Sequence, residues 1–294
     1  MTENEVKAIR WMKCVKDDAV RRKEMPMNKT KIEWCDSTWN PVTGCLHACG
    51  YCYARRIAER FGGWSTGGVK TKENFVKQEP PELDKPLLVQ RKNGKAVNAP
   101  FPFGFSPTLH RYRMGEPIAK KTGQTIFVCS MADLFGSWVP DSWIDEVFAA
   151  CERVPQHRYL FLTKNHRRYL DLAAAGKLPF NDNMWYGTTV TSLNDMFFFS
   201  EAHHTFISIE PMTERLFAGA DITKLVDWVI IGAMTGPGSA EYQPKREWIQ
   251  EVVSSADDAG VPVFMKDSLI PIVGDENMRR EFPWEVKENC TKSW

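Results

Sequence analysis

Three cysteines, Cys45, Cys49 and Cys52, lie within eight positions in the segment GCLHACGYCYAR. An odd number of thiols cannot all form disulfides, and three thiolates so close together are typical metal ligands. His47 could join them in a Cys3His site for tetrahedral zinc, although structural zinc ligands usually come as two separated pairs. An iron–sulfur cluster is the other possibility, because cysteine thiolates are its usual ligands. The residue types and their spacing therefore predict a metal centre in this loop.

The C-x3-C-x2-C spacing resembles the signature of the radical S-adenosylmethionine (SAM) superfamily. The resemblance implies a [4Fe-4S] cluster with three irons held by Cys45, Cys49 and Cys52 and a fourth iron open to SAM. It also implies that Tyr51, the aromatic residue before the third cysteine, lies next to the adenine of SAM. A reductant of the flavodoxin or ferredoxin type would supply the electron that cleaves SAM to methionine and a 5'-deoxyadenosyl radical.

The composition is that of an ordinary globular protein, with 294 residues of which 43% are hydrophobic and 26% charged. The net charge of +1 creates no global field for nucleic acid, so any such binding must depend on a local basic face. We expect no membrane association and a cytoplasmic location, because no long apolar stretch and no signal-peptide core is present. The other cysteines are scattered, which fits a reducing compartment: Cys14, Cys35, Cys129, Cys151 and Cys290.

Short apolar runs rich in β-formers recur after residue 124, and several are separated by amphipathic helical segments. Continuous apolar strands that alternate with helices predict parallel β/α units. With one strand before the cysteine loop, around Ile32 and Trp34, about seven strands are expected. The predicted fold is α/β, a full or partial TIM-type (β/α) barrel as in the radical SAM superfamily. The later strands are expected over residues 125–130, 159–163, 184–190, 205–210, 228–232 and 262–266.

We expect an N-terminal extension over residues 1–28, a barrel domain over 29–268 and a C-terminal tail over 269–294. Between about residues 62 and 124, after the helix that follows the cysteines, the pattern breaks down into Gly, Pro and basic residues. An insertion of this length is usually functional.

The insertion is locally basic, with an excess of seven positive charges between Lys85 and Lys121. Aromatic residues alternate with these charges, an arrangement suited to a phosphate backbone and stacked bases. The expected nucleic-acid contacts are Arg91, Lys92, Arg111 and Arg113. The alternative is a solvated insertion that its Phe residues anchor to the barrel.

Polar residues follow almost every predicted strand, and in (β/α) barrels the site is built at these C-terminal ends. They are Ser130 and Asp133, Thr163 and Lys164, Thr188 and Thr189, Ser208 and Glu210, Gly232, and Lys266 and Asp267. The cysteine loop also follows a strand, so we expect the metal centre and these residues to share one mouth. The same groups can instead satisfy backbone groups at strand ends.

The superfamily resemblance implies SAM-binding roles for several of these residues. Ser130, in the segment CSMAD with Asp133, stands where the second strand contacts the amino group of SAM, and Lys164 can meet the carboxylate. The expected ribose contacts are Thr188, Thr189 and Ser192. Glu210 is expected to orient SAM or the substrate, and Gly232 resembles part of the adenine-contacting strand. Candidates for the residue that returns a hydrogen atom are Cys129, Tyr53 and Tyr186, with Cys129 as the catalytic prediction.

Motifs along residues 29–268, among them TKIEWCDSTWNPVTGC, TFISIEP and DWVIIGAMTGPG, resemble a family of phage-associated radical-SAM-like proteins of poorly defined function. Two departures are Cys35, where that family commonly has Thr, and the short gap between the first two cysteines. The cluster loop also resembles that of spore-photoproduct-lyase-like DNA repair enzymes. These resemblances imply a bacterial or phage-infected host cytoplasm and chemistry on a nucleobase in DNA, such as rearrangement, modification or repair. The alternatives are a radical SAM enzyme for a peptide or small metabolite, and a nonenzymatic metal-binding partner protein.

Overall fold

The computed structural model describes residues 28–62, 80–90, 93–216 and 222–285. The predicted N-terminal extension lies outside the described residues except for Asn28. Arg91 and Lys92, which were predicted to bind nucleic acid, also lie outside them.

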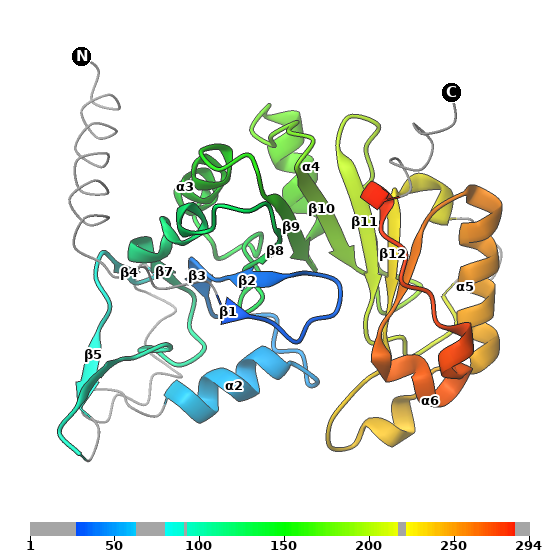
Figure 1. Ribbon diagram of the computed structural model, residues 1–294, viewed down its shortest axis with the longest axis horizontal. Helices are drawn as coiled ribbons and strands as arrows, with labels where there is room; N and C mark the ends of the chain where they lie inside the picture. The colour runs from blue at the N-terminus through cyan, green and yellow to red at the C-terminus, as the bar shows by residue number, and fades with distance from the viewer. Residues whose placement is uncertain (1–27, 63–79, 91–92, 217–221, 286–294) are drawn as a thin grey trace.

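Seven parallel strands form one curved sheet, and a short antiparallel strand extends its first edge (Figure 1). The predicted partial (β/α) barrel is therefore confirmed. The first parallel strand begins later than expected, because the chain turns at Glu33 and Trp34 before entering it. In spatial order the strands are β1 (Asn28–Lys29), β2 (Ser37–Trp39), β8 (Thr125–Val128), β9 (Arg158–Thr163), β10 (Met184–Thr189), β11 (His204–Ile209), β12 (Trp228–Ile231) and β13 (Val263–Met265).

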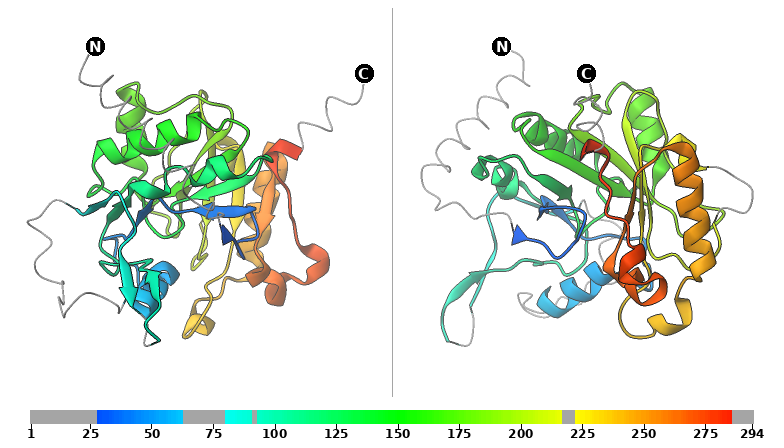
Figure 2. Two further views of the ribbon diagram at one scale, coloured as in Figure 1. Left: turned by 60° about the vertical axis from the view of Figure 1, so that its left-hand side comes forward. Right: turned by 45° about the vertical axis from the view of Figure 1, so that its right-hand side comes forward.

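Helices cover the convex face of the sheet: α3 (Asp141–Glu152) and α4 (His166–Ala174) on one half and α5 (Arg246–Ala259) on the other (Figure 2). Apolar residues of α3 recur at helical spacing, and Ile144, Val147 and Phe148 face the sheet. Phe148 meets Phe161 of β9 edge to face, with 5.4 Å between ring centroids. This packing buries alternate residues of each strand on the convex side.

The other strand residues point to the concave face, where aromatic side chains fill the lower part of the barrel. Trp34 turns into this cluster and packs against Phe127 with 4.6 Å between ring centroids. Gly187 makes room for the ring of Phe206, because a Cβ at this position would lie 2.2 Å from the ring. The barrel is therefore filled at this level, and a pocket can form only above it.

The open side of the barrel is closed by two contacts at its edges. Asp267 donates its backbone N–H to Glu33 Oε1 at 2.9 Å, which ties the loop before β2 to the loop after β13. The chain near residue 280 pairs antiparallel with the outer edge of β13, and Phe282 and Trp284 then pack against Trp228. The described part of the predicted C-terminal tail thus belongs to the packed structure.

The insertion contains short elements beside the cysteine loop. A small sheet has the order β3 (Val42–Thr43), β7 (Thr108–His110) and β4 (Glu82–Leu83), and a hairpin joins β5 (Leu88–Gln90) to β6 (Ala96–Asn98).

The remaining elements are α2 (Tyr53–Gly62), η3 (Arg111–Arg113), η4 (Glu116–Ala119), η5 (Ile222–Leu225), η6 (Ser239–Tyr242), η7 (Asp267–Leu269), α6 (Ile270–Val273) and η8 (Asp275–Asn277). Among the described helices, none is long and apolar enough to cross a membrane.

Glu116, at the start of η4, should make stability depend on pH. Burial raises the pKa of this carboxyl from 4.5 to about 7, so the folded state holds a proton that the unfolded state has lost. Stability contributed by this proton is lost as pH rises from about 4.5 to 7. We expect the unfolding free energy of Glu116→Gln, relative to that of the wild type, to rise by about 1–3 kcal/mol as the pH increases over this range. Urea denaturation at both ends of the range tests this, and parallel pH profiles of the two proteins would contradict it.

Candidate functional site

One pocket lies at the C-terminal ends of the parallel strands, and the cysteine loop forms part of its wall. The pocket joins residues from segments far apart in the sequence, as expected for this face of a (β/α) barrel. Of the residues expected at the site, those that line it are Cys45, Cys49, Cys52, Tyr51, Tyr53, Ser130, Asp133, Thr163, Lys164, Thr189, Ser208, Glu210 and Lys266.

The cysteine loop is held by backbone contacts on both sides. Gly44 donates its N–H to the Met131 carbonyl at 2.9 Å, and Cys45 donates to the Phe105 carbonyl at 3.1 Å. Gly44 has a φ of +90°, and a Cβ here would lie 2.2 Å from the Ser106 carbonyl oxygen. Only glycine tolerates both conditions. The glycine at the start of the loop is therefore a requirement of the backbone.

The donor set of this loop is three cysteine thiols, which suits an iron–sulfur cluster. Among the described residues, no three His, Cys, Asp or Glu side chains converge in a way that could hold one metal ion. His47 is engaged elsewhere, since its Nε2 lies 2.7 Å from Asp133 Oδ2. Cysteine thiolates are the usual ligands of such clusters, and all three line the same pocket. Cys52 Sγ also accepts the Arg55 backbone N–H at 3.4 Å, a type of contact that tunes cluster potentials.

Burial affects the protonation of one cysteine in this set. It raises the pKa of Cys45 to about 12, so the thiol is neutral without metal. Metal binding at this position must displace its proton.

The buried carboxylate of Asp133 joins three segments around the pocket. Its Oδ1 accepts from the Thr163 hydroxyl at 2.7 Å and the Phe135 N–H at 3.0 Å. Its Oδ2 accepts from the Lys164 N–H at 3.0 Å and from His47. Because these four donors occupy its lone pairs, Asp133 positions the cysteine loop against β8 and β9.

The predicted cofactor residues Tyr51 and Lys164 meet directly. Lys164 Nζ donates to the Tyr51 hydroxyl at 2.9 Å and lies 5.3 Å from the centroid of its ring. Ser130 is fixed by Asn40, whose Oδ1 accepts from the serine hydroxyl at 3.2 Å and from the Met131 N–H at 2.9 Å. Asn40 was not predicted, although its place between β2 and the cysteine loop was a usable signal.

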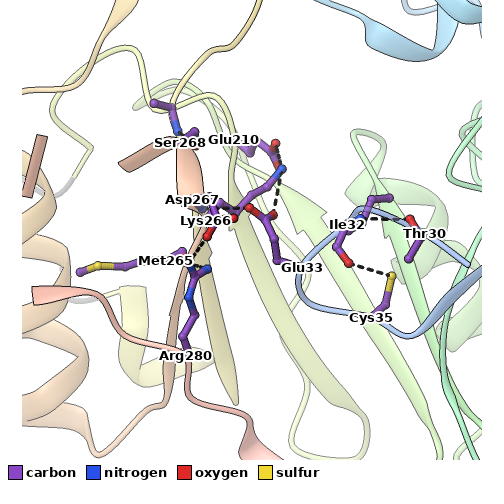
Figure 3. Close-up of polar contacts among 11 residues, drawn as sticks. Thr30, Ile32, Glu33, Cys35, Glu210, Met265, Lys266, Asp267, Ser268 and Arg280 are labelled. Atoms are coloured by element: carbon purple, nitrogen blue, oxygen red, sulfur yellow. Dashed lines mark hydrogen bonds and ion pairs between the residues drawn. The ribbon is translucent and has the colours of Figure 1, made fainter. Parts of the chain in front are cut away.

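A charged group forms the opposite wall of the pocket. Lys266 lies between two carboxylates, with its ammonium bonded to Glu210 and 4.0 Å from Glu33 Oε2 (Figure 3). Gly232 does not line the pocket, but a Cβ there would lie 3.0 Å from Lys266 Cδ and 3.3 Å from Glu210 Cγ. Its small size therefore gives this ion pair room. Lys266 follows β13 as Lys164 follows β9, and the sequence placed it at the mouth with the other strand-end residues but gave it no role in binding SAM.

Several predicted residues lie away from the pocket. Thr188 is fully buried on the convex side, where its hydroxyl accepts the Phe198 N–H at 3.1 Å. Ser192 belongs to an exposed turn in which Asp195 accepts its backbone N–H. Cys129 packs in the core between the sheet and the helices α3 and α4, and burial raises its pKa to about 12. Tyr186 is also in this core and donates to the Pro179 carbonyl, whereas Tyr53 lines the pocket and donates to the Ser130 carbonyl.

The two predicted nucleic-acid residues within the described chain are engaged by the protein itself. Arg111 binds three carboxylates, those of Glu82, Asp84 and Glu146. Arg113 donates to the carbonyls of Asn40 and Pro100. Arg111 therefore has few N–H groups left to bind a phosphate. Its three acidic partners lie outside residues 85–121 in the sequence, so they offset part of the positive charge counted there.

Comparisons with known proteins place the chain in a broader context. Residues 29–269 match the family described as "Protein of unknown function (DUF5131)". A search of curated proteins found no match. Among solved structures, a spore photoproduct lyase complexed with dinucleoside spore photoproduct is similar at a TM-score of 0.45 and 10% identity, covering 84% of this chain and 81% of that one. A mutant of spore photoproduct lyase is similar at a TM-score of 0.44 and 10% identity, with 83% and 81% covered.

Changing Gly44 to Ala should disturb the cysteine loop. The positive φ and the clash with the Ser106 carbonyl should lower the unfolding free energy by about 2–4 kcal/mol. Gly50→Ala in the same loop is the matched control, because a Cβ at Gly50 meets nothing within 4 Å. Chemical denaturation of both variants measures the difference, and equal stabilities would contradict our account of the loop.

Changing Asp133 to Asn should destabilise the region around the pocket. An amide nitrogen would face donors that now point at a carboxylate oxygen, which we expect to cost about 2–4 kcal/mol. Asp145→Asn, on the exposed side of α3, serves as the control. Hydrogen exchange at the Phe135 and Lys164 amides should rise in the Asp133 variant alone. Unchanged exchange at both amides would show that Asp133 does not hold these segments.

Proposed function

We propose that this chain, which belongs to the DUF5131 family of proteins of unknown function, is a radical SAM enzyme. The observation that carries the proposal is the convergence of Cys45, Cys49 and Cys52 with polar strand-end residues in one pocket. A three-cysteine cluster leaves one iron for an outside ligand, and the pocket gives such a ligand a place beside it.

The residues around the cysteines have separate roles in this proposal. Cys45, Cys49 and Cys52 would hold the [4Fe-4S] cluster. The charge of Lys164 would pair with the carboxylate of SAM, and its contact with Tyr51 orients it for this. Ser130 and Thr189 would supply hydrogen bonds from the neighbouring strands. When bound, the cluster and SAM supply reductive cleavage of SAM to methionine and a 5'-deoxyadenosyl radical.

We further propose that the substrate is a nucleobase in DNA, which the chain would rearrange, modify or repair. The described part of the insertion reaches the pocket, because Phe105 lines it. An aromatic side chain in the wall of a pocket suits a base turned out of its stack. The sequence predicts basic residues in the same insertion, including Arg91 and Lys92, for the phosphates. An electron carrier of the flavodoxin or ferredoxin type would reduce the cluster.

Anaerobic reconstitution tests the enzyme class. The protein is loaded with iron and sulfide, reduced with dithionite and supplied with SAM, and 5'-deoxyadenosine is assayed by mass spectrometry. We expect product from the wild type and at least a hundredfold less from Cys45→Ala, Cys49→Ala and Cys52→Ala. The control is Cys151→Ala, because this thiol is buried in the α3 core.

The same assay separates the alternatives. Stimulation by DNA would support a nucleobase substrate, whereas stimulation only by peptide or metabolite fractions would support a different radical SAM enzyme. Binding of one zinc ion, or a cluster that never cleaves SAM with any of these additions, would contradict the proposal.

A further inference from the structure

We propose that the wall of the pocket opposite the cysteine loop is a recognition site for a single pyrimidine base. This inference builds on the proposed function and specifies its substrate. The site consists of Trp34, Ser208, Glu210 and Lys266, all of which line the pocket. It is formed by strands β11 and β13 and by the loop before β2.

Two buried polar groups at this wall have no partner among the described residues. They are the indole Nε1 of Trp34 and the hydroxyl of Ser208, in side chains that are 2% and 1% exposed. A buried hydrogen-bonding group without a partner costs about 1–3 kcal/mol. Both residues line the pocket, so a small rotation of either side chain would bring its polar group to a bound molecule that supplies the missing partner.

The charged residues at the same wall retain hydrogen-bonding capacity. The Lys266 ammonium has three N–H donors, and its contacts with Glu210 and Glu33 engage two at most (Figure 3). Glu210 receives Lys266 on Oε1, which leaves Oε2 to accept from a ligand. Both side chains are partly shielded from solvent, so their hydrogen bonds are stronger than on an open surface.

These groups define what a ligand must offer. Trp34 and Lys266 only donate, so the ligand needs two acceptors, and Glu210 requires one donor. Ser208 can serve either kind of group. The pairing edge of thymine or cytosine carries two acceptors and one donor. Adenine has one of each and guanine has one acceptor and two donors, so neither purine matches.

Apolar side chains beside these groups suit a planar ring. Trp34 and Phe127 pack together, and Ile32 and Leu162 extend the same lining. A base taken out of its stack is usually read by hydrogen bonds to its pairing edge and by contact with aromatic or apolar side chains. The wall supplies both kinds of contact.

Nucleotide binding to the full-length protein tests this site, measured by calorimetry with thymidine, deoxycytidine, deoxyadenosine and deoxyguanosine monophosphates. We expect each pyrimidine nucleotide to bind at least tenfold more tightly than either purine nucleotide. Ser208→Ala and Trp34→Phe should each weaken the binding of thymidine monophosphate about threefold to tenfold, because each substitution removes one hydrogen bond.

Thr205→Val is the matched control. Thr205 lies three residues before Ser208 on β11, and its buried hydroxyl also lacks a partner among the described residues. It does not line the pocket, so we expect its substitution to change nucleotide affinity less than twofold. An equal effect of Thr205→Val and Ser208→Ala would overturn the site, as would equal binding of purines and pyrimidines.

SAM affinity, measured on the same variants, separates this site from that of the cofactor. If Ser208→Ala or Trp34→Phe weakens the binding of SAM as much as that of thymidine monophosphate, the wall belongs to the SAM site and our inference is overturned. If no version of the protein cleaves SAM but pyrimidine selectivity still depends on Ser208 and Trp34, the proposed function fails and the pyrimidine site stands.

Discussion

A buried carboxylate must have a hydrogen-bond donor at each lone pair, and in this protein that requirement organises the pocket. Asp133 satisfies it with His47 from the cysteine loop, Phe135 from its own turn, and Thr163 and Lys164 from the end of β9. None of these donors can leave without exposing a charge to a poorly solvated environment. Together with the backbone bonds of Gly44 and Cys45, this side chain fixes the position of the three thiols relative to the sheet. Lys164, which meets Tyr51, is held by the same group.

The barrel could be predicted from the sequence because its signal is periodic and local. Six of the parallel strands overlap the expected apolar runs, and α3 and α5 lie between these runs, as expected of amphipathic helical segments. The first strand was placed too early because Ile32 and Trp34 have strong β propensity. Trp34 instead enters a turn and packs against Phe127. Tertiary packing overrides local propensity at this position.

The candidate site was harder to predict, for reasons visible in individual residues. Thr188 and Thr189 were both expected at the pocket, but neighbours in a strand point to opposite faces, so only one can line it. Arg111 was counted as free positive charge, although its carboxylate partners lie outside the window in which charges were summed. Lys266 and Glu33 are 233 positions apart in the sequence, and only the curvature of the sheet brings them together. The cysteine triplet was recognisable because its ligands are local.

The bond between Glu33 and the backbone of Asp267 has a consequence for the order of folding. It joins residues 234 positions apart, so almost the whole chain must be synthesised and collapsed before it can form. Contacts of such long range are slow to form, since the entropy of closing the loop is lost before the contact contributes. The half of the pocket near the cysteines can therefore assemble first. The wall that contains Trp34 and Lys266 is completed only when the last strand docks, so under the proposed function a nascent chain would acquire its cluster before it acquires a substrate site.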